Sequence, residues 1–177
     1  MFFSLILACT FNGGIGNDNL IPWNIKEEML LFKKITSEVN CYVKKNAVIM
    51  GKNTWDSLPK KPLDNRINII LTSKPELINQ NDSNIFAFKS LDEGLDFCEK
   101  TIHVNKIFII GGKKLYDLCL NNHKYLNKIE HIHLSLIKDN YNCDTFIDLK
   151  KILKNFNKYH INDVIFNSNF IYVKYIK

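Results

Sequence analysis

Arginine is almost absent from this chain of 177 residues. Its single arginine, Arg66, stands against 23 lysines and 23 asparagines, so nearly every positive charge is a flexible ammonium group. A guanidinium group differs because its planar fork binds a carboxylate through two parallel hydrogen bonds. Arg66 therefore indicates a site that needs this fork, although the chance survival of one arginine explains the count equally well.

A long apolar run is also missing, because no stretch approaches the ~20 apolar residues that span a bilayer. The apolar opening Phe2–Cys9 has the composition of a signal-peptide core. However, no positively charged segment precedes it, no small-residue cleavage site follows it, and Gly13-Gly14 soon ends it. We therefore predict a buried first strand here, and no membrane partner.

The use of cysteine excludes a disulfide framework. The cysteines are odd in number, lie far apart and form no Cys-x-x-Cys motif: Cys9, Cys41, Cys98, Cys119 and Cys143. This pattern predicts reduced thiols in a reducing compartment, which we take to be the cytoplasm. The histidines form no ligand-spaced cluster, so we predict no metal site.

The formal net charge of +6 raises the question of a nucleic-acid partner. The positive residues are scattered singly and in pairs, and no lysine-rich block alternates with aromatic residues, so we predict no nucleic-acid binding. A polyanionic cofactor needs only a local basic patch. With 46% hydrophobic residues, the composition fits one globular domain over residues 1–177.

Strand-like and helix-like patterns alternate along the chain without repeats or a linker. Continuous apolar runs are typical of strands covered on both faces, as in a parallel sheet flanked by helices. Strands are predicted at Phe2–Cys9, Ala47–Met50, Ile67–Leu71, Ile85–Phe88, Lys106–Ile110, Ile129–Ile137, Phe156–Val164 and Phe170–Ile176. Helices are predicted at Ile25–Glu38, Lys52–Leu58, Leu91–Thr101 and Lys113–Cys119.

The predicted fold class is therefore α/β, with a mostly parallel central sheet of about eight strands and four flanking helices. An antiparallel hairpin through Asn167-Ser168-Asn169 should form one edge. The capping box Ser90-Leu91-Asp92-Glu93 fixes the start of the third helix. Asn24 is the predicted cap of the first helix, with Glu27 at the third helical position.

Glu28 has no such local explanation. Steps of three and four residues place it on one helix face with apolar neighbours, namely Ile25, Leu31, Phe32 and Ile35. Because burial of an unpaired carboxylate is costly, such a group is protonated, paired or kept for chemistry. The periodicity alone leaves these three alternatives open.

Two strand-to-helix junctions join glycine to lysine, at Gly51-Lys52 and at Gly111–Lys114. In a parallel sheet both lie at the carboxyl edge, where ligands bind. Glycine permits close backbone approach, and the first turn of a helix offers free N–H groups to phosphate. Neither junction has Rossmann or P-loop spacing, and ordinary turn chemistry explains each one alone. Together with Thr72-Ser73-Lys74 after a third strand, they indicate a dinucleotide with an extra phosphate.

Several short pieces follow one another in a specific order and spacing: Ser4–Ala8, Gly14–Gly16, Leu20–Trp23, Glu28–Phe32, Val48–Trp55, Arg66–Asn68, Ile110–Gly112 and Asp144–Phe146. Through these pieces the chain resembles the dihydrofolate reductase family over nearly its whole length. Glutamate at position 28 is similar to the eukaryotic pattern, whereas Asn65 stands where glycine is usual and Ser135 where threonine is usual. Asn tolerates positive φ, and the serine hydroxyl can make the same bond to the carboxylate.

The resemblance implies NADPH-dependent reduction of 7,8-dihydrofolate to 5,6,7,8-tetrahydrofolate, which supplies one-carbon metabolism and thymidylate synthesis. Hydride would pass to C6 and a proton to N5. Glu28 would bind the pterin ring, Trp23 would help hold a proton-donating water, and Ser135 would bond to the carboxylate. Phe11–Asn24 would be the loop that closes over the nicotinamide, and Arg66 would bind the α-carboxylate of the glutamate tail.

The resemblance also implies two sets of contacts. The substrate or an antifolate inhibitor would touch Ile6, Ala8, Ile21, Glu28, Met29, Phe32, Leu58, Leu63, Arg66, Ile110 and Tyr116. NADPH would touch Ala8, Ile15, Gly16, Gly51, Lys52, Asn53, Thr54, Leu71, Thr72, Ser73, Lys74, Ile110, Gly111, Gly112, Lys113, Lys114, Leu115 and Tyr116. Lys52 and Ser73 would lie closest to its 2′-phosphate.

Two other functions fit some of the same residues. One is an NADPH reductase of the same fold, such as the pyrimidine reductase of riboflavin synthesis, although Glu28 after Pro22-Trp23 and a carboxylate-binding Arg66 argue against it. The other is a non-catalytic binding module, against which the retained site residues argue. Many protists fuse this domain to thymidylate synthase, so an association with that enzyme is expected. Because the chain ends soon after its last predicted strand, we expect that partner to be absent or trimmed away.

Overall fold

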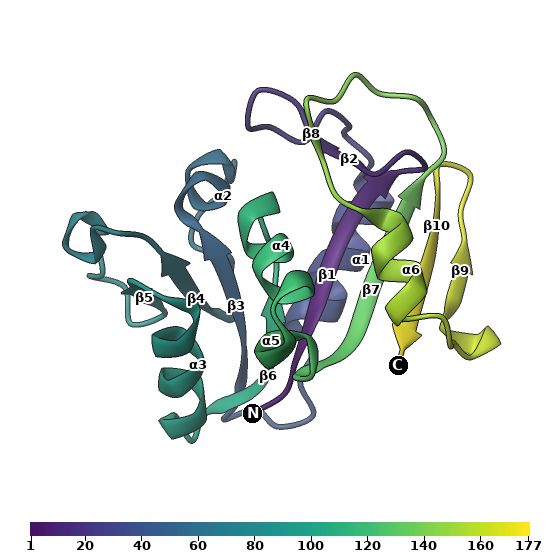
Figure 1. Cartoon of the computed structure of the whole chain (residues 1–177). Helices are drawn as coiled ribbons and strands as arrows, with labels where there is room; N and C mark the ends of the chain where they lie inside the picture. Colours follow the sequence, from purple (N-terminus) through teal and green to yellow (C-terminus); the bar gives the residue numbers. More distant parts are fainter.

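The computed structural model describes all residues, Met1–Lys177, and is built around one eight-stranded sheet (Figure 1). The strands of this sheet are β1 (Phe3–Thr10), β3 (Lys45–Gly51), β4 (Arg66–Leu71), β5 (Ile85–Phe88), β6 (Val104–Ile109), β7 (Ile129–Ile137), β9 (Val164–Phe166) and β10 (Phe170–Ile176). Their order is β5-β4-β3-β6-β1-β7-β10-β9. Neighbours from β5 to β7 are parallel, whereas β10 runs antiparallel to both β7 and β9. A separate small sheet pairs β2 (Gly14–Gly16) with β8 (Thr145–Phe146).

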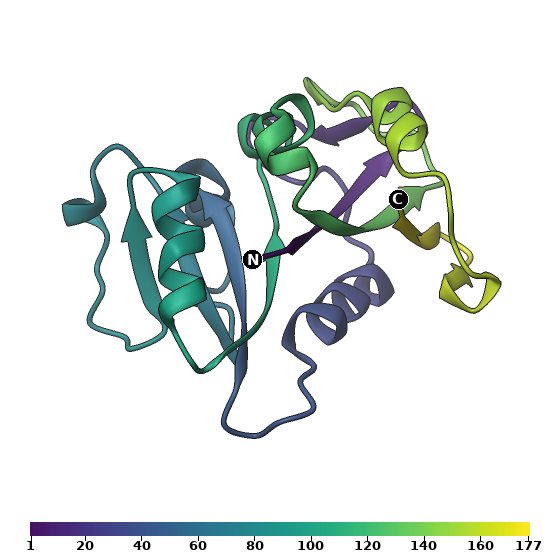
Figure 2. The same cartoon turned by 60° about the horizontal axis from the view of Figure 1, so that its bottom comes forward.

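Helices cover both faces of the large sheet. They are α1 (Lys26–Ser37), α2 (Lys52–Ser57), α3 (Leu91–Lys100), α4 (Lys113–Asn121), α5 (His123–Leu126) and α6 (Leu149–Asn155). Figure 2 shows α1 on the opposite side of the sheet from α4, α5 and α6. None of these helices combines the length and the apolar character that a membrane crossing requires.

Alternate residues of the central strands feed two cores. Leu5 and Leu134 belong to the core beneath α3, α4 and α6, whereas Ile6, Val48 and Phe108 belong to the core beneath α1 and α2. Both faces of the central strands are therefore mostly apolar, which explains their continuous apolar runs.

The predicted fold class is confirmed, and so are most elements. β5, β7 and β10 begin and end at the predicted residues. The edge hairpin closes where Asn167 N–H donates to the carbonyl oxygen of Phe170 at 3.0 Å. Ser90 caps α3 by accepting from the N–H of Glu93 at 3.2 Å, and the Glu93 carboxylate accepts from the N–H of Lys89 at 3.1 Å.

The predicted strand Phe156–Val164 is wrong. An unpredicted helix, α6, comes just before it, and the side chain of Asp148 caps this helix by accepting from the N–H of Lys151 at 2.9 Å. Phe156 is fully buried because it anchors the end of α6, whereas Ile161 is exposed in a short 3₁₀ turn. Only Val164–Phe166 forms a strand at this edge.

The predicted cap of α1 is also wrong. The helix begins at Lys26 after Ile25, without a side-chain cap, so Glu27 is its second residue. Ile25 is buried in one cluster with Trp23. Packing, instead of an Asn24 hydrogen bond, therefore fixes where the chain enters the helix.

Candidate active site

The sheet brings the two predicted glycine junctions into contact. Gly51 N–H, at the end of β3, donates to the carbonyl oxygen of Gly111, just after β6, at 2.8 Å. Gly111 has φ +103° and precedes a cis peptide bond to Gly112. A Cβ atom at Gly111 would lie 2.9 Å from the ring of Tyr116, and one at Gly112 would lie 3.1 Å from the hydroxyl oxygen of Thr54. Both the conformation and the space at position 111 therefore require glycine.

The first turn of α4 supplies donors beside this contact. The N–H groups of Lys113 and Lys114 have no backbone acceptor, as is usual at the start of a helix. The ammonium group of Lys113 lies 2.7 Å from Asp117, and Lys52 pairs with Asp56. This edge thus combines free backbone donors with lysines, a combination that suits phosphate.

A neighbouring strand end adds polar residues, one of which was not predicted. The N–H of Thr72 donates to the carbonyl oxygen of Phe88 at 2.9 Å, so the turns after β4 and β5 lie together. Ser73, Lys74 and the unpredicted Lys89 are exposed in these turns, and neither lysine forms an ion pair. The sequence could have indicated Lys89, because this residue directly follows the predicted strand Ile85–Phe88.

Glu28 lies in the first turn of α1 with its side chain half-buried and no ion pair to any cation. Burial raises the pKa of its carboxyl group, and a hydrogen bond with the side chain of Ser135 opposes that rise. Tyr116 lies nearby: burial raises the pKa of its hydroxyl group, and the charges of Cys119 and Glu28 add to the rise. Pairing with a positive side chain of this chain is thereby excluded for Glu28.

Trp23 is buried just before α1, with 8% of its surface exposed. Its ring meets that of Tyr141 edge-on at 5.6 Å, and it clusters with Ile25 and Tyr172. Ala8 packs against the same cluster, which places Trp23 beside the carboxyl end of β1.

The predicted loop Phe11–Asn24 is fastened at its tip and its base. At the base, β2 pairs with β8. At the tip, the N–H of Asp18 donates to the carboxylate of Asp144 at 2.8 Å, and Asn53 donates to the side chain of Asn19 at 3.4 Å. Asp18 and Asn19 both have positive φ, as in a tight two-residue turn. The tip therefore lies against the start of α2, near the Gly51 junction.

Arg66 is 4% exposed yet has no carboxylate partner in the protein. Its Nε donates to the carbonyl oxygen of Asp64 at 2.9 Å, and one terminal nitrogen donates to the hydroxyl of Thr36 at 2.7 Å. The ring of Phe32 lies 5.9 Å from the guanidinium carbon. Burial lowers the pKa of Arg66, while the charge of Asp64 opposes this. A buried positive charge with a free terminal nitrogen is thus ready for an outside acceptor.

The predicted apolar contacts are only partly brought together. Five of them pack in one cluster under α1 and α2: Ile6, Phe32, Leu58, Leu63 and Ile110. Ile21 and Met29 are 65% and 51% exposed, so nothing in the protein covers them. Four predicted cofactor contacts, one of them also a predicted substrate contact, lie in or against the opposite core: Ile15, Leu71, Leu115 and Tyr116.

A scan against protein-family models matches residues 2–177 to the model described as dihydrofolate reductase. The chain belongs to the dihydrofolate reductase family. Enzymes of this family are NADPH-dependent oxidoreductases that reduce dihydrofolate to tetrahydrofolate, as the sequence predicts. The match favours this function over a pyrimidine reductase or a non-catalytic module.

Several known proteins of the dihydrofolate reductase family are similar to this chain. The dihydrofolate reductase of Heliothis virescens is 37% identical over 146 residues, which cover 81% of this chain and 77% of that protein. That of Pneumocystis carinii is 35% identical over 158 residues, covering 83% and 74%. Bifunctional dihydrofolate reductase-thymidylate synthase 2 of Arabidopsis thaliana is 35% identical over 150 residues, covering 82% of this chain but only 26% of that protein. The chain thus spans about a quarter of the length of this bifunctional relative.

The departure from the dihydrofolate reductase pattern at Asn65 leaves the local backbone intact. Asn65 has φ +59°, the left-handed conformation for which glycine is usual and asparagine is tolerated. The next residue is Arg66, so the turn still delivers the guanidinium group to its buried position.

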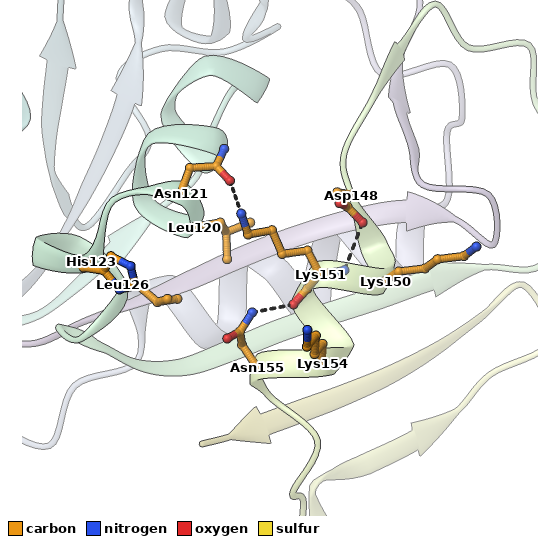
Figure 3. Close-up of a pocket in the computed structure, with 9 residues that line it drawn as sticks. All are labelled: Leu120, Asn121, His123, Leu126, Asp148, Lys150, Lys151, Lys154 and Asn155. Carbon is orange, nitrogen blue, oxygen red and sulfur yellow. Dashed lines mark hydrogen bonds between the residues drawn. The ribbon is translucent and has the colours of Figure 1, made fainter.

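A polar pocket lies away from the predicted site residues (Figure 3). It has a volume of about 550 Å³ between α4, α5 and α6 and is lined mostly by polar side chains. Lys151 bonds to the side chain of Asn121 there, and Asn155 donates to the carbonyl oxygen of Lys151 at 2.8 Å. None of the predicted site residues lines it.

Gly111→Ala is expected to lower the free energy of unfolding by about 1–3 kcal/mol, because alanine is strained at positive φ and its Cβ would meet the Tyr116 ring. Gly51→Ala is the matched control. Its φ is −74°, and its added Cβ would meet only atoms at ordinary contact distance. Denaturant unfolding of both variants measures the difference, and equal stabilities would contradict this account of position 111.

Proposed function

We propose that this chain binds dihydrofolate and NADPH at the carboxyl edge of its sheet, with Glu28 as the central carboxyl group of the reaction. The observation that carries this assignment is a half-buried carboxyl without a cationic partner, bonded to Ser135. Loss of NADPH absorbance after addition of dihydrofolate tests the activity. A purified, folded chain that oxidises no NADPH under these conditions would contradict it.

Glu28 would bind the pterin ring through both carboxylate oxygens, one to the 2-amino group and one to N3–H. Hydrogen bonds to a charged acceptor are about twice as strong as neutral ones. The partial burial of the Glu28 carboxylate strengthens both bonds further, because it limits competition from water. Ser135 would hold the carboxyl group in position through its hydroxyl. The pterin would therefore be oriented by one helix and one strand, both of them rigid.

Protonation of N5 would use a water molecule, because Glu28 bound at N3 is too far from N5 to reach it. Burial raises the pKa of Glu28, which moves it in the direction that suits a general acid working near neutral pH. Trp23, fixed by its cluster, would help hold the water.

The strand ends fit a dinucleotide phosphate. The Gly111-Gly112 backbone and the first turn of α4 would hold the pyrophosphate. Lys52, Ser73 and Lys74 would hold the 2′-phosphate. Lys89 would also contact it, because the turn after β5 lies beside the turn that carries Ser73 and Lys74. When bound, NADPH supplies the hydride that C6 accepts.

The apolar cluster would line the space between the two ends of the substrate, with Phe11–Asn24 closing over the reacting rings and excluding water. The exposure of Ile21 and Met29 supports this arrangement, because a bound ring would cover them. Arg66 would receive the α-carboxylate of the glutamate tail through its free terminal nitrogen.

We also propose an association with thymidylate synthase, because several relatives carry both activities in one named protein. Co-purification of the two proteins from one extract tests this, and their separate migration at every concentration tried would contradict it. The five free thiols favour a reducing compartment such as the cytoplasm.

Glu28→Gln is expected to slow hydride transfer ~10²–10⁴-fold at neutral pH, the usual value of general acid assistance. The loss should be smaller in acid, where solution protonates the substrate first. The same variant should be more stable than the parent at neutral pH and equal to it in acid. Because the pKa of Glu28 is raised in the folded state, the unfolded chain releases this proton first as pH rises, and its ionisation favours unfolding. Glutamine has no proton to release, so the variant avoids this loss of stability. Near-native turnover at neutral pH would remove Glu28 from the mechanism.

The unmodified chain is expected to prefer NADPH to NADH, and the double change Lys52→Ala with Ser73→Ala should narrow that preference. Each lost hydrogen bond to a charged phosphate is worth ~1.5–3 kcal/mol. Lys89→Ala should act in the same direction, whereas Lys44→Ala, at the opposite end of β3, should have no effect. The preference is measured as the ratio of the KM for NADH to the KM for NADPH. Equal use of NADPH and NADH by the parent would refute this phosphate site.

Arg66→Lys should raise KM for dihydrofolate ~10–150-fold, which corresponds to ~1.5–3 kcal/mol for a charge-assisted contact. Lysine keeps the charge but not the two parallel bonds. A small diaminopyrimidine inhibitor without a glutamate tail is the control, and its affinity should hardly change. If that inhibitor weakens as much as the substrate, Arg66 supports the fold and not the tail.

A further inference from the structure

Three polar side chains lie in a row on one face of β7. Residues two apart on a strand point the same way, so His131, His133 and Ser135 share the face that α1 covers. In the sheet, Ser135 is paired with Ala8 of β1 on one side and with Tyr172 of β10 on the other. Tyr172 therefore stands next to the residue that bonds to Glu28.

Tyr172 and His133 form a buried hydrogen bond. The hydroxyl oxygen of Tyr172 lies 2.7 Å from Nδ1 of His133, and the two residues are 7% and 8% exposed. Burial, followed by the charges of His131, Lys174 and Lys106, lowers the pKa of His133 to about 3. The ring is therefore neutral at the pH values where the reaction runs, and the bond to Tyr172 persists throughout them.

The ring of Tyr172 packs in the same buried cluster as Trp23. Tyr172 belongs to the buried cluster of Trp23, Ile137 and Phe170, and Leu31 of α1 packs against the same cluster. The ring is thus enclosed between Trp23, the sheet and the helix that carries Glu28. Its hydroxyl is anchored away from this cluster, on His133.

We propose that Tyr172, anchored by His133, is a positioning residue that fixes Ser135 and keeps water from the protein side of Glu28. This inference rests on the proposed role of Glu28 in the reaction. Tyr172 is paired with Ser135 in the sheet, and its hydrogen bond to the buried His133 fixes the ring beside the residue that bonds to Glu28. Loss of the hydroxyl leaves Nδ1 unpaired in the core, a state that costs enough for water to enter or the ring to move.

The electrostatic surroundings of Glu28 make the consequence specific. Ser135 from β7 bonds to its carboxyl group, the charge of Glu28 acts on the phenol of Tyr116 from α4, and no positive side chain pairs with the carboxyl group. The charges around His133 are Lys106, Lys174 and His131, which pairs only with the exposed Glu130. Burial is thus the main cause of the raised Glu28 pKa, and hydration of this region lowers it.

Tyr172→Phe tests the inference through the pH dependence of hydride transfer. The alkaline limb is the part of the pH profile where the rate falls as pH rises. We expect this limb to move ~0.5–1 pH unit lower, so that above the pKa of Glu28 the variant is about 3- to 10-fold slower than the parent. The rate in acid and KM for dihydrofolate should not change, because Arg66 binds the tail elsewhere. An unmoved limb, with only a loss of stability, overturns the inference.

Tyr175→Phe is the matched control, because it makes the same change on the same strand in the opposite core. Tyr175 is 9% exposed and packs edge-on against Tyr159 at 5.8 Å, so its loss should affect stability without moving the limb. An equal shift in this control overturns the inference.

Two changes at His133 give an independent reading if Tyr172→Phe does not fold. His133→Gln retains a hydrogen-bond partner for the hydroxyl and should keep the parent profile, whereas His133→Leu should reproduce the shift. Identical profiles for these two variants overturn the inference. Failure of the proposed function is distinguishable, since the parent would then lack activity or Glu28→Gln would keep the alkaline limb.

Discussion

The hydrogen bond from Gly51 N–H to the carbonyl oxygen of Gly111 joins the ends of two central parallel strands. It forms because β3 and β6 are neighbours and because Gly111 adopts a positive φ that requires glycine. Two helices begin directly after these glycines, so their first turns converge at one place. The tip of the loop Phe11–Asn24 reaches the same place through Asn53. The edge proposed for the cofactor thus depends on one close backbone contact.

The substrate side depends on a single helix. Glu28 lies in the first turn of α1 and Thr36 in its last, so the rise per residue separates them by ~12 Å. Thr36 accepts from Arg66, and the buried Asn46 donates to the carbonyl oxygens of Thr36 and Glu38 at 3.1 and 2.9 Å. The end of α1 is therefore fixed to the sheet through the arginine and the asparagine. A rigid helix sets the spacing between the groups proposed for the two ends of dihydrofolate.

The charges of the site are distributed according to burial. Exposed lysines at the cofactor edge pair with aspartates one turn away, which adds little stability and leaves them free to exchange partners. Neither the half-buried Glu28 nor the buried Arg66 forms an ion pair within the protein, and burial disfavours the charged form of each. A ligand that offers hydrogen-bond donors to Glu28 and a carboxylate to Arg66 would stabilise the charged form of each. The unpaired charges are thus the strongest electrostatic feature of the candidate site.

The sequence by itself determined whatever depends on local pattern and on residue type. Continuous apolar runs predicted the central strands, and the capping box at Ser90 predicted the start of α3. The lone Arg66 and the carboxylate of Glu28 on an apolar helix face are the residues from which the sequence predicts a site. The same patterns failed at Phe156–Val164 and at Asn24, where packing around Phe156 and Ile25 outweighed local preference. Only the tertiary structure decided which strand ends touch and that the turns of Lys74 and Lys89 lie together. It also decided that Tyr172, paired with Ser135 in the sheet, bonds to His133. These contacts join residues far apart in the chain, and their geometry follows from sheet order and register, which no local periodicity encodes.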